Sequence, residues 1–258
     1  MGIAIYNDVA VDPVPPTPDS QGRDGIQTPT ANQSILMHAA LFGHPVGYAQ
    51  EQNGKLIQDV FPVKGTETRQ ISTSSKTELA LHTETAFHPY KPDYVLLLCL
   101  RGDENAETTF ASIENILPYL SQHTIDTLQE EWFVTGIDES FRTHGEPDVE
   151  IPLSVLKRDE RGWRLTYDAT VMKGINEAAD MALRNLEWAV SMGTQSIALK
   201  TGQLMVIDNN STVHGRKPFQ PRYDGTDRWL KRVLVVEELP PDSEYDNGVI
   251  TTQFTSAS

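Results

Sequence analysis

One apolar run, from Tyr94 to Leu100, constrains the fold of this chain more than any other segment. Its residues are Tyr-Val-Leu-Leu-Leu-Cys-Leu, a length that suits a strand and falls far short of the roughly 20 residues of a membrane span. Alternate residues of a strand point to opposite faces, so a strand that is apolar at every position needs cover on both faces. The run therefore predicts a sheet that is packed on both sides.

Short strands and a few helices are predicted around this run. Asn53-Gly54, Thr201-Gly202 and the segment 159–162 provide turns between them. Because strands and helices do not alternate regularly, the chain is expected to be mainly β with inserted helices, as a sandwich or jelly roll, rather than a parallel α/β fold. The strands are expected at 55–63, 79–85, 151–157, 163–168, 196–200, 203–208 and 230–237, and the helices from Ser34 to near Gly43, over 111–132 with a break between Leu120 and Thr124, and over 177–192 between an Asn176 cap and a Gly193 stop.

Composition divides the chain into a short lead and one domain. Residues 9–33 contain five prolines among polar residues, a composition that cannot bury enough apolar surface to offset its ordering entropy. We expect residues 1–33 to form a flexible lead and residues 34–258 to form a single domain, as a chain of this length allows.

Charge and cysteine content narrow the class of partner. With 36 acidic and 21 basic residues the net charge is −15, which repels phosphate backbones, so no nucleic-acid partner is expected. No membrane span and no secretory signal are visible. The single cysteine, Cys99, excludes an intrachain disulfide and suits the cytoplasm, and inside an apolar run it is expected to be a buried, inert thiol.

His82-Thr83-Glu84 on the strand predicted at 79–85, together with His214 far downstream, is the pattern that carries chemistry. Residues i and i+2 of a strand share a face, so His82 and Glu84 can grip one ion, and a third ligand from another strand completes one face of an octahedron. Two imidazoles and a carboxylate with open positions are typical of non-haem iron(II) oxygenases. The tripeptide alone is weak evidence, because 7 His and 36 acidic residues give about one such match by chance.

Arg228, fourteen residues after His214, strengthens the hypothesis. A guanidinium on the strand after the last ligand is what a bidentate clamp on a dicarboxylate cosubstrate requires. Thr109, 27 residues after His82, is expected to add a hydroxyl to the same carboxylate.

Taken together, these motifs resemble a known family, the clavaminate synthase-like branch of the taurine dioxygenase superfamily, which includes asparagine and arginine β-hydroxylases of peptide-antibiotic pathways. Glu84 in place of Asp is itself a mark of this branch. The resemblance covers roughly residues 41–236, and its matching stretches are 54–62, 81–89, 208–209, 213–216 and 222–232. It implies a distorted double-stranded β-helix that binds iron(II) and uses 2-oxoglutarate and dioxygen.

The resemblance also implies roles for single residues. His82, Glu84 and His214 match the iron ligands, and Arg228 and Thr109 match the clamp on 2-oxoglutarate. The substrate would be held by a second group: Arg232 and Ser72 at its α-carboxylate, Glu84 at its α-amine, Asp168 at its side chain, and Gln58 as a further contact. From the residues alone, Asp168 can equally be an acidic turn residue, Ser72 part of a polar loop, and Arg232 a charge at a strand edge.

The expected activity is hydroxylation of a free L-amino acid at its β-carbon, in specialised metabolism such as antibiotic biosynthesis. Asp168 and the acidic balance favour a polar or cationic side chain, as in asparagine, arginine or lysine. A ring-closing or desaturating oxygenase with the same iron site is one alternative, and a non-catalytic jelly-roll binding module is another. Relatives carry a longer N-terminal region, so the short lead leaves pocket closure and oligomeric state open, and the sequence does not identify the amino acid.

Overall fold

A computed structural model describes residues 2–20, 27–141 and 149–252 of the chain. The largest element is an eight-stranded sheet in which all neighbours are antiparallel except β17 and β2. Its order is β1 (Ile3–Tyr6), β13 (Leu204–Asp208), β5 (Tyr94–Arg101), β15 (Trp229–Val236), β2 (His44–Tyr48), β17 (Val249–Ile250) and β16 (Tyr245–Asp246), with β3 (Gln58–Val60) also paired to β15.

A four-stranded antiparallel sheet faces the large one. Its order is β12 (Gln195–Ile197), β6 (Thr108–Ser112), β14 (Thr212–Arg216) and β4 (Leu79–His82). Phe110 and Ile197 of this sheet pack against the apolar cluster on one face of the large sheet. The space between the two sheets is therefore the core of the molecule.

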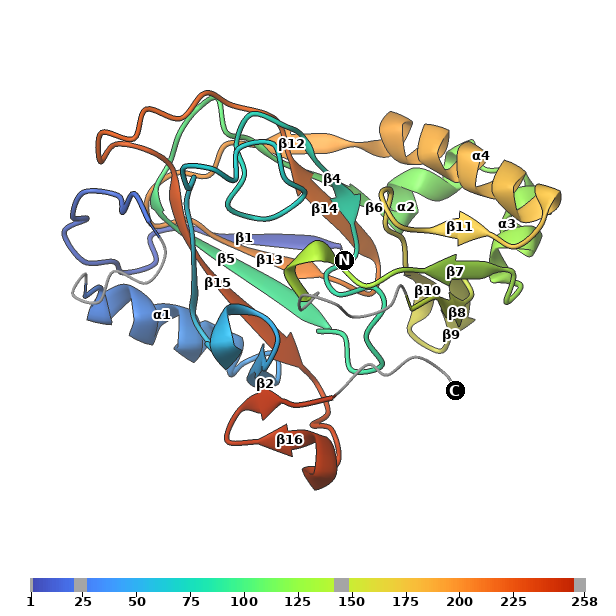
Figure 1. Cartoon of the computed structure of the whole chain (residues 1–258), viewed down its shortest axis with the longest axis horizontal. Helices are drawn as coiled ribbons and strands as arrows, with labels where there is room; N and C mark the ends of the chain where they lie inside the picture. The colour runs from blue at the N-terminus through green and yellow to red at the C-terminus, as the bar shows by residue number, and fades with distance from the viewer. Residues whose placement is uncertain (1, 21–26, 142–148, 253–258) are drawn as a thin grey trace.

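Strand β5 has apolar neighbours on both faces, as the sequence predicts. Val95, Leu97 and Cys99 belong to the cluster between the sheets. Leu96, Leu98 and Leu100 belong to a second cluster, where Ala31, Ile35 and Ala39 of helix α1 (Pro29–Ala39) cover the outer face of the large sheet. In Figure 1, α1 lies along this outer face.

A third cluster covers the far face of the small sheet. It contains Ala111 of β6, Val213 of β14 and the apolar face of α4 (Glu177–Gly193). Around α4 lie α2 (Ile113–Ile116), α3 (Gln122–Gln129), a hairpin of β9 (Leu156–Asp159) and β10 (Gly162–Leu165), and a sheet of β11 (Lys173–Gly174), β7 (Phe133–Thr135) and β8 (Ile151–Leu153). Short 3-10 turns occupy Gln52–Gly54, Leu117–Tyr119, Glu139–Phe141 and Asp242–Glu244.

Helix α4 and the hairpin of β9 and β10 both form where the sequence predicts them. The Asn176 side chain accepts a hydrogen bond from the Ala179 amide at 2.9 Å and caps α4. The helix includes Gly193 instead of stopping before it. A Cβ there would lie 2.9 Å from the Asn115 carbonyl oxygen. This glycine therefore allows α4 to pack closely against α2.

Other boundaries differ from the prediction. Most strands are shorter than expected: β3 occupies only Gln58–Val60 of the predicted 55–63, and β4 ends at His82 rather than Thr85. Residues 111–112 belong to β6, whereas the helical segment that follows breaks near Leu120 as expected and restarts at Gln122.

The Pro-rich lead contains regular structure at both ends. Residues Ile3–Tyr6 pair with β13 as an edge strand, and α1 begins at Pro29, five residues before the predicted start. Between them, Arg101 donates hydrogen bonds to the carbonyls of Val14 and Pro15. Residues 21–26 lie outside the described part of the chain, and the flexibility of the lead stays a prediction.

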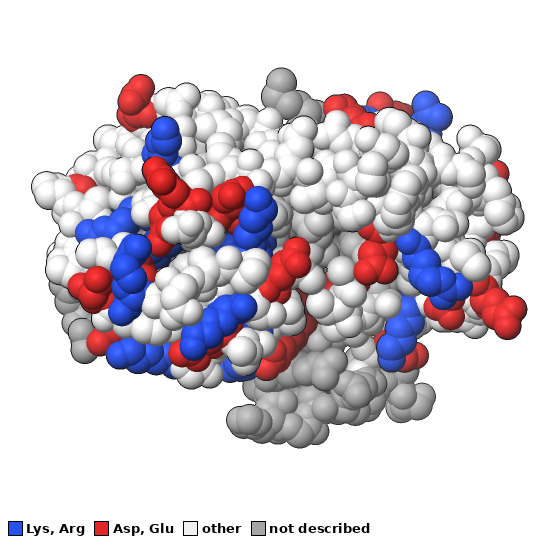
Figure 2. Space-filling view, turned by 90° about the horizontal axis from the view of Figure 1, so that it is seen from above, with Lys and Arg blue, Asp and Glu red and all other residues white. Residues whose placement is uncertain are grey.

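Surface charge and helix length bear on two of the expected absences. Figure 2 shows acidic and basic side chains interspersed over one face, with no continuous basic stripe among the described residues drawn there. The absence of a nucleic-acid partner stays a prediction. Within the described ranges, no helix combines the length and the apolar character that crossing a membrane requires.

Candidate metal centre

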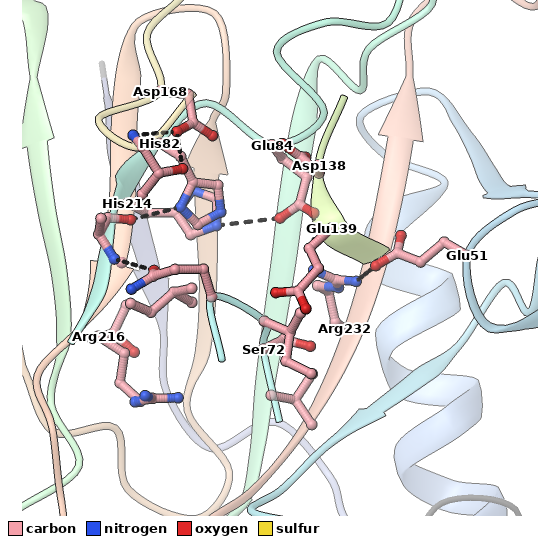
Figure 3. Close-up of a pocket in the computed structure, with 18 of the residues that line it drawn as sticks. Glu51, Ser72, His82, Glu84, Asp138, Glu139, Asp168, His214, Arg216 and Arg232 are labelled. Atoms are coloured by element: carbon pink, nitrogen blue, oxygen red, sulfur yellow. Dashed lines mark hydrogen bonds and ion pairs between the residues drawn. The ribbon is translucent and has the colours of Figure 1, made fainter. Parts of the chain in front are cut away.

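Three side chains, two from one short segment and one from far downstream, converge between the two sheets. His82, Glu84 and His214 each offer one ligand atom, and these atoms all lie within 4.8 Å of one another. His214 Nε2 lies 3.3 Å from Glu84 Oε2. Glu84 is 5% and His214 6% exposed. The structure thus brings together the three residues that the sequence predicts as metal ligands (Figure 3).

Strand register places the two histidines opposite each other. His214 of β14 pairs with His82 of β4, while Arg216 pairs with Leu79, so β4 carries one extra residue between the two pairs. Such a bulge re-aims the side chains beside it. Here the His82 Nδ1 donates to the Ala80 carbonyl at 2.8 Å, which leaves Nε2 with its lone pair free for a cation.

Glu84 lies beyond the end of β4, so the expectation that it sits on the same strand as His82 is wrong. Side-chain direction still alternates from His82 through Thr83 to Glu84, because Tyr167 fixes Thr83 on the opposite side. The Thr83 amide donates to the Tyr167 carbonyl at 2.7 Å, and the Thr83 hydroxyl accepts from the Tyr167 amide. Asn209 then holds the Glu84 backbone, accepting from its amide at 2.8 Å and donating to its carbonyl at 3.1 Å.

A buried network orients the Glu84 carboxylate. Arg232 donates to Glu84 Oε1 at 2.9 Å, to Glu51 Oε1 at 2.5 Å and to Gln58 Oε1. Burial alone would raise the pKa of Glu84, but Arg232 and His214 outweigh it and hold that pKa well below its usual range. Burial similarly favours neutral Arg232, yet Glu51 and Glu84 raise its pKa, so the cation and the carboxylate that faces the histidines are both ionised.

The unsatisfied atoms of the cluster fit a metal ion. Glu84 Oε2 is buried without a hydrogen-bond donor among the described residues, and His214 Nε2 faces it at 3.3 Å. Burial lowers the pKa of His214, so its ring is neutral and suited to act as a ligand. Two imidazoles and one carboxylate, all opening onto a cavity, are the donor set of a three-ligand iron(II) site with positions left for other ligands.

The cluster opens on a cavity of about 320 Å³, a size suited to a small molecule. Charged side chains of both signs line its wall, and Arg232 lies between the carboxylates of Glu51 and Glu84 (Figure 3). Besides the three candidate ligands, its charged residues are Glu51, Asp138, Glu139, Asp168, Arg216, Arg228 and Arg232.

Arg228 lies where the sequence predicts a carboxylate clamp, but its hydroxyl partner is Thr108 and not Thr109. Arg228 is 7% exposed, and it donates to Thr108 Oγ1 at 2.9 Å. Thr108 lines the cavity, whereas Thr109 does not. Successive residues of β6 point to opposite faces, and Thr108 shares the inner face with Phe110. The cosubstrate contact predicted for Thr109 stays a prediction, and Thr108 is the threonine that the structure places beside Arg228 in the cavity.

The predicted substrate contacts divide into cavity residues and supports. Ser72, Asp168 and Arg232 line the cavity. Asp168 is also a turn residue, because its Oδ1 accepts from the Thr170 amide at 2.7 Å and from the Thr170 hydroxyl at 2.6 Å. Gln58 does not line the cavity. It is 1% exposed, and its Oε1 accepts a hydrogen bond from Arg232 Nε.

Sequence reasoning missed Glu51 and Asp138. Glu51 is 6% exposed, lines the cavity and pairs with Arg232, and burial outweighs that arginine in raising its pKa. Asp138 also lines the cavity, and burial, then Asp168 and Glu84, raise its pKa well above the ordinary value. Neither residue lies on a periodic strand or in a motif, so only tertiary contact reveals them.

Comparison with known proteins agrees with this geometry. Residues 24–234 match the family described as Taurine catabolism dioxygenase TauD, TfdA family. The L-asparagine oxygenase of Streptomyces coelicolor is 38% identical over 242 residues, which cover 92% of this chain and 72% of that protein. The enduracididine beta-hydroxylase of Streptomyces hygroscopicus is 32% identical over 94% of this chain and 79% of that protein.

Solved structures show the same likeness in three dimensions. Asparagine oxygenase in complex with Fe(II), 2S,3S-3-hydroxyasparagine and succinate is similar with a TM-score of 0.88 and 35% identity, over 98% of this chain and 80% of that one. The non-heme iron oxygenase OrfP in complex with Fe, succinate and (3S)-hydroxy-L-Arg gives a TM-score of 0.83 and 33% identity, over 93% and 77% of the two chains.

Proposed function

This chain belongs to the TauD, TfdA dioxygenase family, and we propose that it hydroxylates the β-carbon of a free L-amino acid at the cluster of His82, Glu84 and His214. It is an iron(II)- and 2-oxoglutarate-dependent oxygenase, as its relatives that act on asparagine, arginine, lysine and enduracididine are hydroxylases of this kind. One observation carries the proposed site: the three ligand atoms converge within 4.8 Å on a cavity with an arginine clamp on its wall.

The chemistry divides between the cofactor and the protein. When bound by the two histidines and Glu84, iron(II) allows dioxygen to oxidise 2-oxoglutarate to succinate and carbon dioxide and to place its second oxygen atom in a substrate C–H bond. The protein binds the two organic reactants, orients them and excludes water.

Arg228 and Thr108 bind the distal carboxylate of 2-oxoglutarate. Arg228 is buried and forms no ion pair with a carboxylate among the described residues, and burial lowers its pKa to about 10. It therefore remains charged near neutral pH. A bound carboxylate that reaches it offsets the free-energy cost of burying this charge.

Arg232 and Glu51 bind the two charged groups of the amino-acid head. Arg232 receives the α-carboxylate, with Ser72 across the cavity, while Gln58 holds the guanidinium in place. The α-amine lies between Glu51 and Glu84, whose carboxylates flank Arg232. Because both ends of the head are fixed beside the candidate ligands, the carbon presented for attack is the β-carbon.

Asp168 and Asp138 face the side chain of the substrate. Both line the cavity, and after burial the charge of Asp168 is the next cause that raises the pKa of Asp138. A polar or cationic side chain fits such a wall, as in arginine, lysine or asparagine.

Three further aspects are part of this proposal. The two facing sheets form a distorted double-stranded β-helix, which the TM-score of 0.88 to an asparagine oxygenase supports. The enzyme acts in specialised metabolism, since clavaminate synthase 2 is 34% identical over 86% of this chain. A cytoplasmic location is supported by Cys99, a buried free thiol.

A substrate panel tests the function. Purified protein with iron(II), 2-oxoglutarate and oxygen is assayed for succinate with each of the common L-amino acids and ornithine. We expect amino-acid-dependent succinate and a product that gains one oxygen atom. A product that loses two hydrogen atoms would identify the desaturating or ring-closing alternative, and absence of succinate with every amino acid would contradict the proposal.

A further inference from the structure

We propose that Arg216 is a positioning residue, which fixes the loop that carries Ser72 to the strand that carries His214. This inference rests on the proposed function for its substrate, but its structural part concerns the free protein. Arg216 lies two residues after His214 on β14, and it shares the inner face of that strand. Figure 3 shows it on the cavity wall with Ser72 and His214.

The guanidinium of Arg216 is committed to this loop. Its NH1 donates to the Ser74 carbonyl at 2.6 Å, and its NH2 donates to the Thr77 carbonyl at 2.8 Å and to Ser74 Oγ at 3.2 Å. The same group lies 5.3 Å from the centre of the Phe219 ring. Arg216 is 2% exposed, so these contacts are shielded from water and each is correspondingly strong.

Backbone hydrogen bonds, such as those from the Ser75 and Lys76 amides to the Glu67 carbonyl, hold the loop together internally, and Arg216 adds the side-chain contact from β14. Residues 64–78 connect β3 with β4 and contain no helix or strand. Ile71 to Ser74 form a turn closed by the Ser74 amide, which donates to the Ile71 carbonyl at 3.1 Å. Ser72 occupies a central position of this turn and lines the cavity.

Ser74 relays the contact from Arg216 to the turn. Its hydroxyl donates to the Ile71 carbonyl at 2.8 Å while it accepts from Arg216. A shift of the guanidinium therefore moves both ends of the turn that presents Ser72. Because Arg216 and His214 are on one strand, this side chain links the position of the substrate-binding loop to the candidate iron ligands, alongside the Phe219 amide, which donates to the Ser75 carbonyl.

The charge of Arg216 offers a different explanation that the test must separate. Arg216 forms no ion pair with a carboxylate among the described residues, and burial, then the nearby Arg228, lowers its pKa to about 9. A second cation near Arg228 would attract 2-oxoglutarate by charge alone. Lysine at position 216 keeps the charge but loses the planar fork that reaches both carbonyls, whereas glutamine loses the charge.

Steady-state kinetics of Arg216→Gln and Arg216→Lys distinguish the two roles. If Arg216 positions the loop, both variants raise the KM for the amino acid by about tenfold, with the KM for 2-oxoglutarate within about twofold of the wild type. Both should also form succinate in excess of hydroxylated product, because 2-oxoglutarate is then oxidised while the misplaced amino acid is not hydroxylated. Arg158→Gln, at an exposed arginine of the β9–β10 hairpin, is the control and should match the wild type.

Hydrogen–deuterium exchange of the free protein tests the structural part without catalysis. Amides of Ser74 to Thr77, which are bonded within the loop, should exchange roughly tenfold faster in Arg216→Gln than in the wild type or in Arg158→Gln. If Arg216→Gln does not fold, Arg216→Lys and Ser74→Ala are judged by the same criteria.

Two outcomes would overturn the inference. One is a rise confined to the KM for 2-oxoglutarate that lysine restores, which would make Arg216 an electrostatic partner of the cosubstrate. The other is unchanged exchange in the loop. If the wild type oxidises no amino acid, the proposed function fails, and the exchange experiment still decides whether Arg216 fixes the loop.

Discussion

His82 and His214 lie directly opposite each other on the neighbouring strands β4 and β14, with ring centroids 4.6 Å apart. A bulge in β4 lies beside this pair, between His82 and Leu79, and within it the Ala80 carbonyl accepts from His82 Nδ1. This hydrogen bond selects the tautomer of His82. This relationship is the structural basis of the site.

The partner of Arg228 can be tested with two adjacent threonines. Thr108→Val removes the hydroxyl that Arg228 contacts, and we expect the KM for 2-oxoglutarate to rise about fivefold. Thr109→Val is the matched control: its hydroxyl is buried without a hydrogen-bond partner among the described residues, so its loss should leave that KM unchanged. The opposite pattern, measured by succinate formation, would restore Thr109 as the cosubstrate contact.

Arg232 should contribute strongly to stability as well as to binding. Arg232→Ala leaves Glu51 and Glu84 buried without their cation, and we expect the free energy of unfolding to fall by about 3–5 kcal/mol. Arg161→Ala removes an exposed ion pair with Glu237 and should leave the free energy of unfolding close to that of the wild type. Urea unfolding of the metal-free proteins measures both, and equal losses would refute the buried network.

Much of the fold was predictable from local pattern. The run from Tyr94 to Leu100 required cover on both faces, and Asn176 marked the start of α4, because both signals act over a few residues. Spacing between residues in the sequence predicted the site less well than local pattern predicted the fold. Thr109 was chosen over Thr108 because spacing does not give the face of a strand, and the bulge in β4 left no trace in the sequence. Glu51 became visible only through its contact with Arg232, 181 residues away.

Asp138 should favour substrates with a cationic side chain over those with a neutral one. Burial and neighbouring carboxylates raise the pKa of Asp138 well above its ordinary value, and a cationic side chain beside it favours the ionised form. Asp138→Asn removes this carboxyl group from the cavity wall, so kcat/KM for arginine or lysine relative to asparagine should fall about tenfold. Asp126→Asn, on the exposed face of α3, should leave this ratio unchanged. A ratio that is the same in both variants would remove Asp138 from substrate recognition.

His88 should make stability depend on pH. Burial lowers its pKa to about 4, whereas in the unfolded chain a histidine titrates near about 6.5. As the pH falls between these values the unfolded state binds the proton first, so the free energy of unfolding decreases. We expect His88→Gln to reduce the loss between pH 7 and pH 5 by about 2 kcal/mol, as measured by urea unfolding. Equal losses in both proteins would contradict a buried, neutral His88.

The central claim is that His82, Glu84 and His214 hold the iron, and an anaerobic titration tests it most directly. Iron(II) and 2-oxoglutarate are added to the wild type, to His214→Ala and to His123→Ala, which alters an exposed histidine of α3, while the visible charge-transfer band of the chelate is recorded. We predict a band that saturates at about one equivalent of iron(II) in the wild type and in His123→Ala, and none in His214→Ala. A band of full intensity in His214→Ala would contradict the assignment.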